Sequence, residues 1–148
     1  MEVKDKAPEL LLVEDFEEDA ILTMRALKKY NLANEIKWVA DGEEAIDFLF
    51  AKGKYENRQK ENTPTIILLD LKLPKIHGLD VLEAIKKDSV LSHIPIIIMT
   101  SSKENEDIEK AYALGANSYV VKPVDFQQFA EAVKEIGIYW LILNEVKK

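Results

Sequence analysis

The chain has 148 residues, with 20 basic and 27 acidic side chains, a formal net charge of −7 and no cysteine. This length predicts a single domain, and the lack of cysteine excludes disulfides, thiolate catalysis and cysteine-type zinc sites. The acidic balance argues against direct nucleic-acid binding. The longest apolar stretch, residues 136–143, is shorter than the roughly 20 residues of a membrane-spanning helix. The charged N-terminus lacks the apolar core of a signal peptide, so we expect a cytoplasmic protein without a membrane partner.

Short apolar runs alternate with amphipathic ones along the chain. The apolar runs predict strands at residues 10–13, 36–39, 66–69, 94–99 and 119–121. Helical spacing and capping residues predict helices at 17–30, after Asp41, at 79–87, at 103–114, and from Asp125 to about residue 144. The polar stretch 52–63 is interpreted as an insertion in a loop. Because strands that are continuous apolar runs are buried on both faces, we predict a doubly wound α/β fold with five parallel strands and helices on both faces.

Four of the apolar runs are followed at once by polar groups that can do chemistry. These groups are Glu14-Asp15, Asp70, Thr100-Ser101 and Lys122. The carboxyl ends of parallel strands lie on one edge of the sheet, which is where open α/β sheets bind ligands. We therefore expect these side chains to converge.

Three carboxylates in one crevice repel one another unless a cation lies among them. Carboxylate oxygens are ligands that Mg²⁺ prefers, and Mg²⁺ keeps places for water and phosphate oxygens. The Lys122 ammonium and the Thr100 hydroxyl add the remaining groups needed to bind and transfer a phosphoryl group, with a carboxylate as the attacking nucleophile.

Each motif also has a structural interpretation. An acidic pair after a strand is usually a helix cap with first-turn charges, a Thr-Ser pair before a helix is usually a cap, and Lys122-Pro123 is a common turn. Asp70 is different, because it follows four apolar residues with no helix start close behind it. Trp38 and Trp140 are interpreted as packing or interface residues, and no chemistry is expected from Asp41 or Asp80.

Together these motifs make the chain similar to the receiver domains of two-component response regulators. The motifs that carry the resemblance are Glu14-Asp15, Asp70, the loop 71–78, Thr100-Ser101, Tyr119 and Lys122-Pro123. The resemblance extends from about residue 9 to about residue 145, and we predict a single receiver domain at 1–148. It implies a flavodoxin-like sheet with strand order 2-1-3-4-5. The 52–63 loop, the Glu-Asp pair and the long aromatic C-terminal helix most resemble stand-alone regulators that partner cyanobacterial-type phytochromes.

The resemblance implies a role for each matched residue. Asp70 accepts a phosphoryl group from a histidine kinase, and Lys122 pairs with the phosphoryl group. In the subfamily named above, the kinase is a phytochrome. Thr100 and Tyr119 form the switch, in which Thr100 turns toward the phosphoryl oxygen and Tyr119 rotates into the vacated space. The Mg²⁺ ligands are Glu14, Asp15, Asp70 and the backbone carbonyl of Lys72. Glu14 stands where most family members have Asp, and a cis peptide usually precedes the proline at position 123.

The last predicted helix carries more apolar residues than one face can hold. Phe126, Phe129, Ala130, Val133, Ile136, Gly137 and Trp140 form a stripe expected to face the sheet. Apolar residues on the other faces indicate a partner, either a second copy of the chain or an effector. The residues assigned to this interface are Phe126, Ile138, Tyr139, Leu141 and Ile142. We expect a homodimer and a receiver with no output domain.

Three alternatives remain. A haloacid-dehalogenase-type phosphatase also uses an aspartyl nucleophile and Mg²⁺, but it carries a second Asp two residues later, where this chain has Lys72. A flavodoxin-type nucleotide-binding module needs a glycine-rich turn after the first strand, which is absent here. A receiver-like module that binds partners without being phosphorylated would not need the full set of switch residues. The favoured prediction is a phosphorylatable signalling domain rather than an enzyme.

Overall fold

The structure is a computed structural model that describes residues 7–145, so both ends of the predicted 1–148 domain lie outside the described residues. Five parallel strands form one sheet in the order β2-β1-β3-β4-β5, as predicted. The strands are β1 (Leu10–Val13), β2 (Ile36–Val39), β3 (Ile66–Leu69), β4 (Ile96–Thr100) and β5 (Ser118–Val121).

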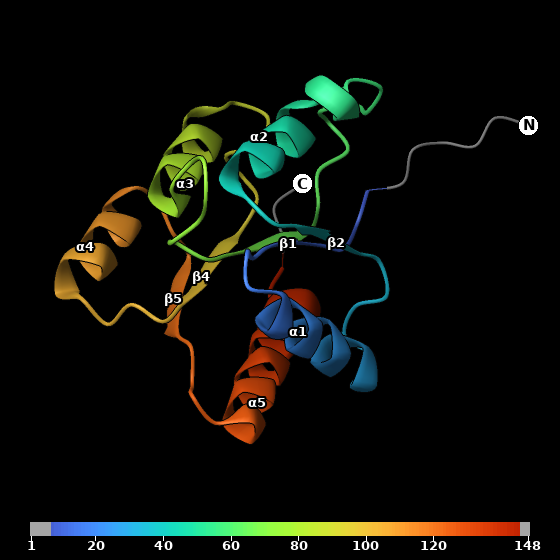
Figure 1. Cartoon of the computed structure of the whole chain (residues 1–148). Coiled ribbons are helices and arrows are strands. Elements are labelled where there is room, and N and C mark those ends of the chain that lie inside the picture. Colours follow the sequence, from blue (N-terminus) through green and yellow to red (C-terminus); the bar gives the residue numbers. More distant parts are fainter. Residues whose placement is uncertain (1–6, 146–148) are drawn as a thin grey trace, which may run out of the picture.

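Five α-helices connect the strands and cover both faces of the sheet (Figure 1). The helices are α1 (Glu17–Lys29), α2 (Gly42–Phe50), α3 (Gly78–Lys87), α4 (Asn105–Ala113) and α5 (Phe126–Gly137). Helices α1 and α5 pack on one face, and α2, α3 and α4 pack on the other. The predicted doubly wound α/β fold is therefore confirmed.

The burial of each strand follows its place in the sheet. Every residue of β1, β3 and β4 is buried, because helices cover both faces and neighbouring strands cover both edges. The edge strands β2 and β5 are mostly half-buried, which explains their mixed sequences. The three central strands thus form a rigid apolar layer, and the residues that follow β1 and β3 are held at its carboxyl edge.

The polar segment 52–63 is ordered against α2 and α3. It begins with a short 3₁₀ helix, η1 (Gly53–Tyr55), and the Tyr55 hydroxyl donates to Glu44 Oε2 at 2.6 Å. Lys60 Nζ lies 2.6 Å from Asp88 Oδ1 at the end of α3. These contacts hold the insertion on the helical face away from α1 and α5.

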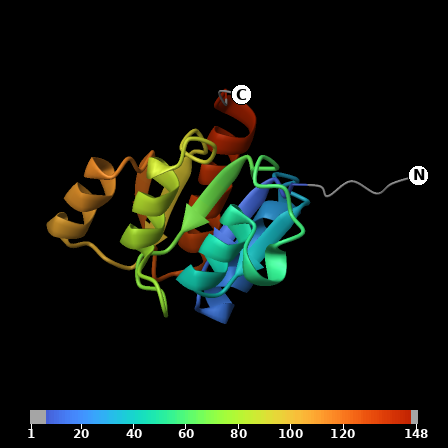
Figure 2. The same cartoon turned by 90° about the horizontal axis from the view of Figure 1, so that it is seen from above.

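The C-terminal helix differs from the prediction of one continuous α-helix. Helix α5 ends at Gly137, and the chain continues as a π-helix, η2 (Ile138–Leu143), in which the Asn144 N–H donates to the Tyr139 carbonyl at 2.6 Å. Figure 2 shows this end of the chain, in red, projecting beyond the neighbouring helices. The expectation that Phe126 faces the sheet is wrong. The buried side of α5 begins at Phe129, and Phe126, the first residue of the helix, is 68% exposed.

Two further local expectations differ from the structure. Helix α4 begins at Asn105 rather than 103, because the preceding residues form a hydrogen-bonded loop. All peptide bonds between residues 7 and 145 are trans, including the one before Pro123. Within this range, none of the helices has both the length and the apolar character needed to cross a bilayer.

Candidate functional site

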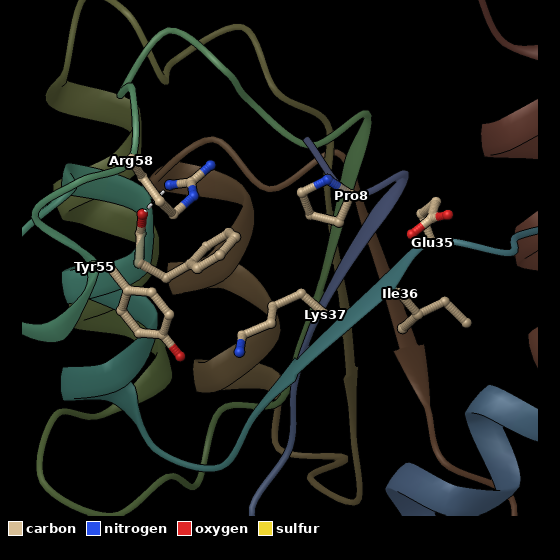
Figure 3. A pocket seen from close by; sticks show the side chains of 7 residues that line it. Pro8, Glu35, Ile36, Lys37, Tyr55 and Arg58 are labelled. Atoms are coloured by element: carbon tan, nitrogen blue, oxygen red, sulfur yellow. Dashed lines mark hydrogen bonds between the residues drawn. The ribbon is translucent and has the colours of Figure 1, made fainter. Parts of the chain in front are cut away.

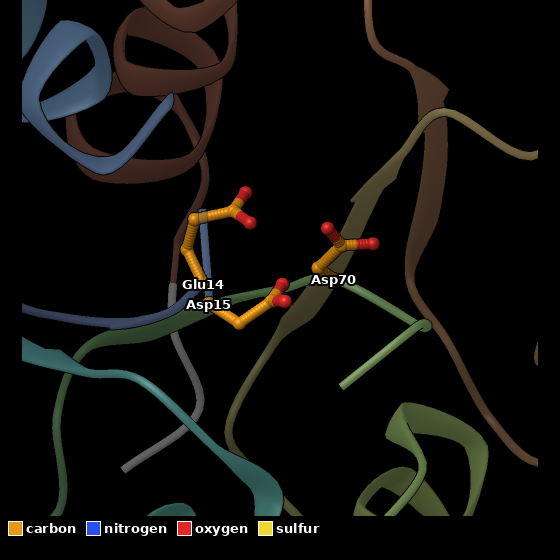
Figure 4. A group of neighbouring side chains, drawn as sticks. All are labelled: Glu14, Asp15 and Asp70. Atoms are coloured by element: carbon orange, nitrogen blue, oxygen red, sulfur yellow. The ribbon is translucent and has the colours of Figure 1, made fainter. Parts of the chain in front are cut away.

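Three carboxylates meet at the carboxyl edge of the sheet, as the strand order requires. Glu14 and Asp15 directly follow β1, and Asp70 directly follows β3. Strands β1 and β3 are neighbours in register, with Val13 opposite Leu69. One carboxylate oxygen from each of the three acidic residues lies within 4.8 Å of the others, and Figure 4 shows the side chains around a shared space. The expected convergence of these groups is therefore present.

The Lys122 ammonium lies among the carboxylates. Its Nζ atom is 2.6 Å from Glu14 Oε1, 2.8 Å from Asp70 Oδ2 and 2.9 Å from Asp19 Oδ2. Burial alone lowers the pKa of Lys122, but the hydrogen bond and charge of Asp70, together with bonds to Glu14 and Asp19, leave it well above its usual range. Lys122 is therefore a fixed positive charge.

Asp19 was not predicted as a site residue. It lies in the first turn of α1, where acidic side chains are expected simply because they complement the helix dipole. Its side chain also turns toward β5 and joins the ion cluster. Nothing in the sequence distinguishes Asp19 from Glu17 and Glu18, the other acidic residues of that turn.

Asp70 is held by its own loop as well as by Lys122. Its Oδ1 atom accepts the Leu71 N–H at 2.7 Å, while Oδ2 accepts from Lys122. The start of α3 approaches this backbone closely, since a Cβ atom on Gly78 would lie 2.3 Å from the Asp70 carbonyl oxygen. Only glycine fits there. The loop between Asp70 and Gly78 is thus closed tightly beneath the acidic side chain.

Glu14 is an unusual carboxyl group because it is almost fully buried. Burial and, to a smaller extent, the nearby charge of Asp70 raise its pKa to about 7, against the lowering effect of the hydrogen bond from Lys122. The carboxyl groups of Glu14, Asp15, Asp19 and Asp70 outnumber the one ammonium of the site. A divalent cation would remove this excess.

The donor set fits a hard divalent cation such as Mg²⁺. Mg²⁺ takes oxygen ligands at about 2.0–2.1 Å in octahedral geometry, and a site it shares with phosphate oxygens needs only a few carboxylates. Asp15 is solvent-exposed, and no side chain or backbone group between residues 7 and 145 forms a hydrogen bond or ion pair with its carboxylate. Lys72 lies in the same loop as Asp70, and its carbonyl remains a predicted ligand.

Thr100 and Tyr119 are connected through Ser102. Thr100 is the last residue of β4 and is fully buried, and its Oγ1 accepts the Ser102 N–H at 3.5 Å. The Tyr119 hydroxyl donates to the Ser102 carbonyl at 3.1 Å, and the Ser102 hydroxyl donates to Asp107 of α4 at 2.6 Å. Ser102 and Asp107 were not predicted, because a serine and an acidic first-turn residue are also the usual residues of a helix start.

A separate cavity of about 380 Å³ lies at the opposite, amino edge of the sheet (Figure 3). Lys37 Nζ lies 5.0 Å from the centre of the Tyr55 ring, and the Arg58 guanidinium lies 3.8 Å from the centre of the Phe48 ring. Arg58 also bonds to the carbonyls of Phe48 and Asn62. These charges hold segment 52–63 against α2, so we assign the functional site to the carboxyl edge.

The residues predicted for an interface have different surroundings. Phe126, Tyr139 and Ile142 are 68%, 51% and 62% exposed. Ile138 and Leu141 are half-buried and pack against the core between α1, α5 and the sheet. Only the first three are therefore available to a partner across most of their surface.

Comparison with known proteins agrees with this geometry. Residues 10–134 match the family model described as the response regulator receiver domain. The chain is 38% identical over 135 residues to the probable methanogenesis regulatory protein FilR2 of Methanothrix harundinacea, covering 91% of this chain and 84% of FilR2. It is 36% identical to response regulator Rcp1 of Synechocystis, covering 89% of this chain and 88% of Rcp1.

The solved structures of two relatives are similar throughout. The phosphorylated cyanobacterial phytochrome response regulator RcpA superposes with a TM-score of 0.89 at 35% identity, covering 96% of this chain and 99% of RcpA. The Mn²⁺-bound form of Rcp1 superposes with a TM-score of 0.87 at 33% identity, covering 95% and 100%. A divalent metal is thus bound by a protein of this fold.

The raised pKa of Glu14 predicts a specific pH dependence of stability. A carboxyl group with a higher pKa in the folded than in the unfolded state stabilises the fold when protonated, and this contribution is lost as pH rises. In the metal-free protein we expect the free energy of unfolding of the unaltered chain to fall, relative to that of Glu14→Gln, as pH rises from about 4.5 to 7. Urea unfolding of both proteins at several pH values measures the two free energies. A difference between them that does not change with pH would contradict the raised pKa of Glu14.

Proposed function

Because the chain belongs to the response regulator receiver family, we propose that Asp70 accepts a phosphoryl group from the phosphohistidine of a histidine kinase in a Mg²⁺-dependent reaction. The observation that carries this proposal is the Asp70 carboxylate, which lies 2.8 Å from the Lys122 ammonium beside Glu14 and Asp15. A nucleophilic carboxylate next to a fixed positive charge and a set of metal ligands suits phosphoryl transfer.

The transfer step balances as a single displacement at phosphorus. An Asp70 carboxylate oxygen attacks the phosphorus atom, the P–O bond forms, and the P–N bond to the kinase histidine breaks. The imidazole keeps the electron pair of that bond and takes up a proton. The product on this chain is a phosphoaspartate, an acyl phosphate.

The cations of the site offset the charge of the transferred group. Glu14, Asp15, Asp70 and the Lys72 carbonyl would hold Mg²⁺, which when bound would neutralise charge on the phosphoryl oxygens. Lys122 can donate to a phosphoryl oxygen once Asp70 Oδ2 carries the new bond. The Leu71 N–H holds the other Asp70 oxygen at 2.7 Å, which limits the rotation of the acceptor carboxylate.

The response to phosphorylation runs through Thr100 and Tyr119. The new dianion offers a better hydrogen-bond acceptor to the Thr100 hydroxyl than its surroundings now provide. When Thr100 turns toward it, the long contact from the Ser102 N–H to Thr100 Oγ1 is lost. The loop that ties Tyr119 to α4 can then change its position, and the surface over α4 and β5 changes with it.

The kinase is proposed to be of the phytochrome class. RcpA, one of the similar proteins, is named as a cyanobacterial phytochrome response regulator. Rcp1, another similar protein, is named as a response regulator. The likeness to FilR2 shows that comparable identity also occurs in a regulator named for methanogenesis. Kinase profiling therefore decides this part of the proposal.

The domain is proposed to act as a signalling switch and not as a phosphatase. A haloacid-dehalogenase-type enzyme would need an acid–base carboxylate two residues after its nucleophile, and that position is the exposed side chain of Lys72. Self-catalysed phosphoryl transfer and slow loss of the phosphoryl group are the only reactions expected.

We propose that the receiver assembles as a homodimer in the cytoplasm. The support is the apolar surface on α5 and η2, where Phe126, Tyr139 and Ile142 are more than half exposed. Half-burial of Ile138 and Leu141 fixes the segment on its own domain, so the exposed residues are presented in one geometry. A second copy would cover them.

Replacing Asp70 by Asn should abolish phosphorylation, because an amide oxygen is a poor nucleophile and the variant loses one metal ligand. We expect Mg²⁺-dependent labelling by acetyl phosphate, measured by intact mass, to fall to background. Asp80→Asn is the matched control, since Asp80 is an exposed acid in the first turn of α3, and it should label normally. Equal labelling of Asp70→Asn would show that Asp70 is not the acceptor.

Phosphotransfer profiling tests the kinase class. The histidine kinases of the same genome are autophosphorylated separately and mixed with the chain for short times. A phytochrome-type kinase should transfer its label faster than the others do, and Asp70→Asn should block the transfer. Preferred transfer from a kinase of another class would replace the phytochrome assignment while leaving the phosphoacceptor assignment intact.

An acidic residue in the exposed C-terminal segment should weaken self-association. We expect Ile142→Asp to raise the dimer dissociation constant by about tenfold or more, since losing a central interface side chain costs about 1–2 kcal/mol. Sedimentation equilibrium measures this, with Tyr112→Asp, a half-exposed residue of α4, as the control. Identical association of both variants and the unaltered chain would remove η2 from the interface.

A further inference from the structure

We propose that Trp38 is a positioning residue for the divalent-metal site, because its indole N–H holds the peptide group that carries Asp15. The Nε1 atom of Trp38 donates to the Glu14 carbonyl oxygen at 2.7 Å. That carbonyl belongs to the peptide bond between Glu14 and Asp15. The inference rests on the proposed Mg²⁺ dependence and adds a residue outside the acidic cluster.

The hydrogen bond joins Trp38 of β2 to Glu14, which directly follows the neighbouring strand β1. In the parallel register Trp38 lies opposite Leu12, two residues before Glu14. The indole therefore reaches along the edge of the sheet rather than straight across it. The Glu14 N–H donates to the Val39 carbonyl at 3.1 Å, so two consecutive residues of β2 hold the backbone of Glu14 at both its N–H and its carbonyl.

The side chain of Glu14 is restrained as well. Oε2 accepts the Phe16 N–H at 3.2 Å, and Oε1 lies 2.6 Å from Lys122 Nζ. Asp15 differs, because its exposed carboxylate has no hydrogen bond or ion pair with any residue in the described range 7–145. The backbone is thus the part of Asp15 that contacts within the domain hold in place, and Trp38 bonds to the peptide group that precedes it.

Metal binding makes this restraint matter. Mg²⁺ accepts little deviation from octahedral geometry, so a ligand whose peptide plane is free to tilt binds it less well. Groups that hold metal ligands in place typically contribute 10–100-fold to metal affinity. Packing alone does not require an indole here, since Trp38 is half-buried and any large apolar side chain could fill the same place against the core.

The test compares Trp38→Phe with Trp140→Phe, its matched control. The chain has two tryptophans, and Trp140 lies in η2 against Tyr139. Phenylalanine at position 38 keeps an aromatic ring and removes the N–H donor. We expect Mn²⁺ affinity, measured by electron paramagnetic resonance, to fall about tenfold in Trp38→Phe and to stay unchanged in Trp140→Phe.

A spectroscopic readout separates positioning from general packing. In Trp140→Phe the emission of Trp38 should change as Mg²⁺ saturates the site, because its N–H bonds to the peptide of a metal ligand. In Trp38→Phe, labelling by acetyl phosphate should be slow at low Mg²⁺ and should recover at saturating Mg²⁺. Labelling that stays slow at saturation would place the effect on the chemistry of Asp70 and overturn the inference.

A second variant covers the case in which Trp38→Phe does not fold. Benzothienylalanine at position 38 keeps the shape of the indole and replaces the N–H by sulfur, and it should show the same tenfold loss. Unchanged Mn²⁺ affinity in either folded variant overturns the positioning role and leaves the metal site in place. If the unaltered chain binds no Mn²⁺, both the inference and the metal dependence of the proposed function fail.

Discussion

The structure depends on one ammonium group that lies among carboxylates from three different elements. Lys122 Nζ is within 2.6–2.9 Å of Glu14, Asp19 and Asp70, which come from the end of β1, from α1 and from the end of β3. Lys122 itself follows β5. A charge buried to this degree is tolerated only when it is paired, and removal of one partner leaves the others unfavourably buried. The ion cluster therefore joins the carboxyl edge of the sheet into one unit.

The strand order explains why a lysine occupies this position. Strand β5 is an edge strand, and β4 separates it from β3. A side chain that follows β5 has to extend past the end of β4 to reach Asp70 and Glu14, and lysine has the required length. Thr100, at the end of β4, lies beneath this path and is fully buried. Asp70, Thr100 and Lys122, the proposed acceptor, switch hydroxyl and cation, are thus arranged along consecutive strand ends.

Much of the fold and the centre of the site could be predicted because both follow from where apolar runs stop. In a parallel sheet the residues at the carboxyl ends of β1, β3, β4 and β5 lie on one edge, and this does not depend on the lengths or positions of the connecting helices. Asp19 and Ser102 could not be recognised in this way, since the same residues are common at helix starts for local reasons. The role of Trp38 depends on a side chain that reaches two residues beyond its paired position. The π-helix of η2 could not be predicted either, because it shares the apolar sequence of an ordinary helix end.

The charge of the site links its resting geometry to its response. Four carboxylates, from Glu14, Asp15, Asp19 and Asp70, share the site with one ammonium, and burial, with a smaller contribution from the charge of Asp70, raises the pKa of Glu14 to about 7. The proposed phosphorylation of Asp70 would add still more negative charge at the same place. Thr100 ends the neighbouring strand β4, and its contact with the Ser102 N–H, at 3.5 Å, is the longest bond of the network that leads to α4. In the proposed switch, this longest contact is the one that is stretched when the Thr100 side chain turns toward a phosphoryl group on Asp70.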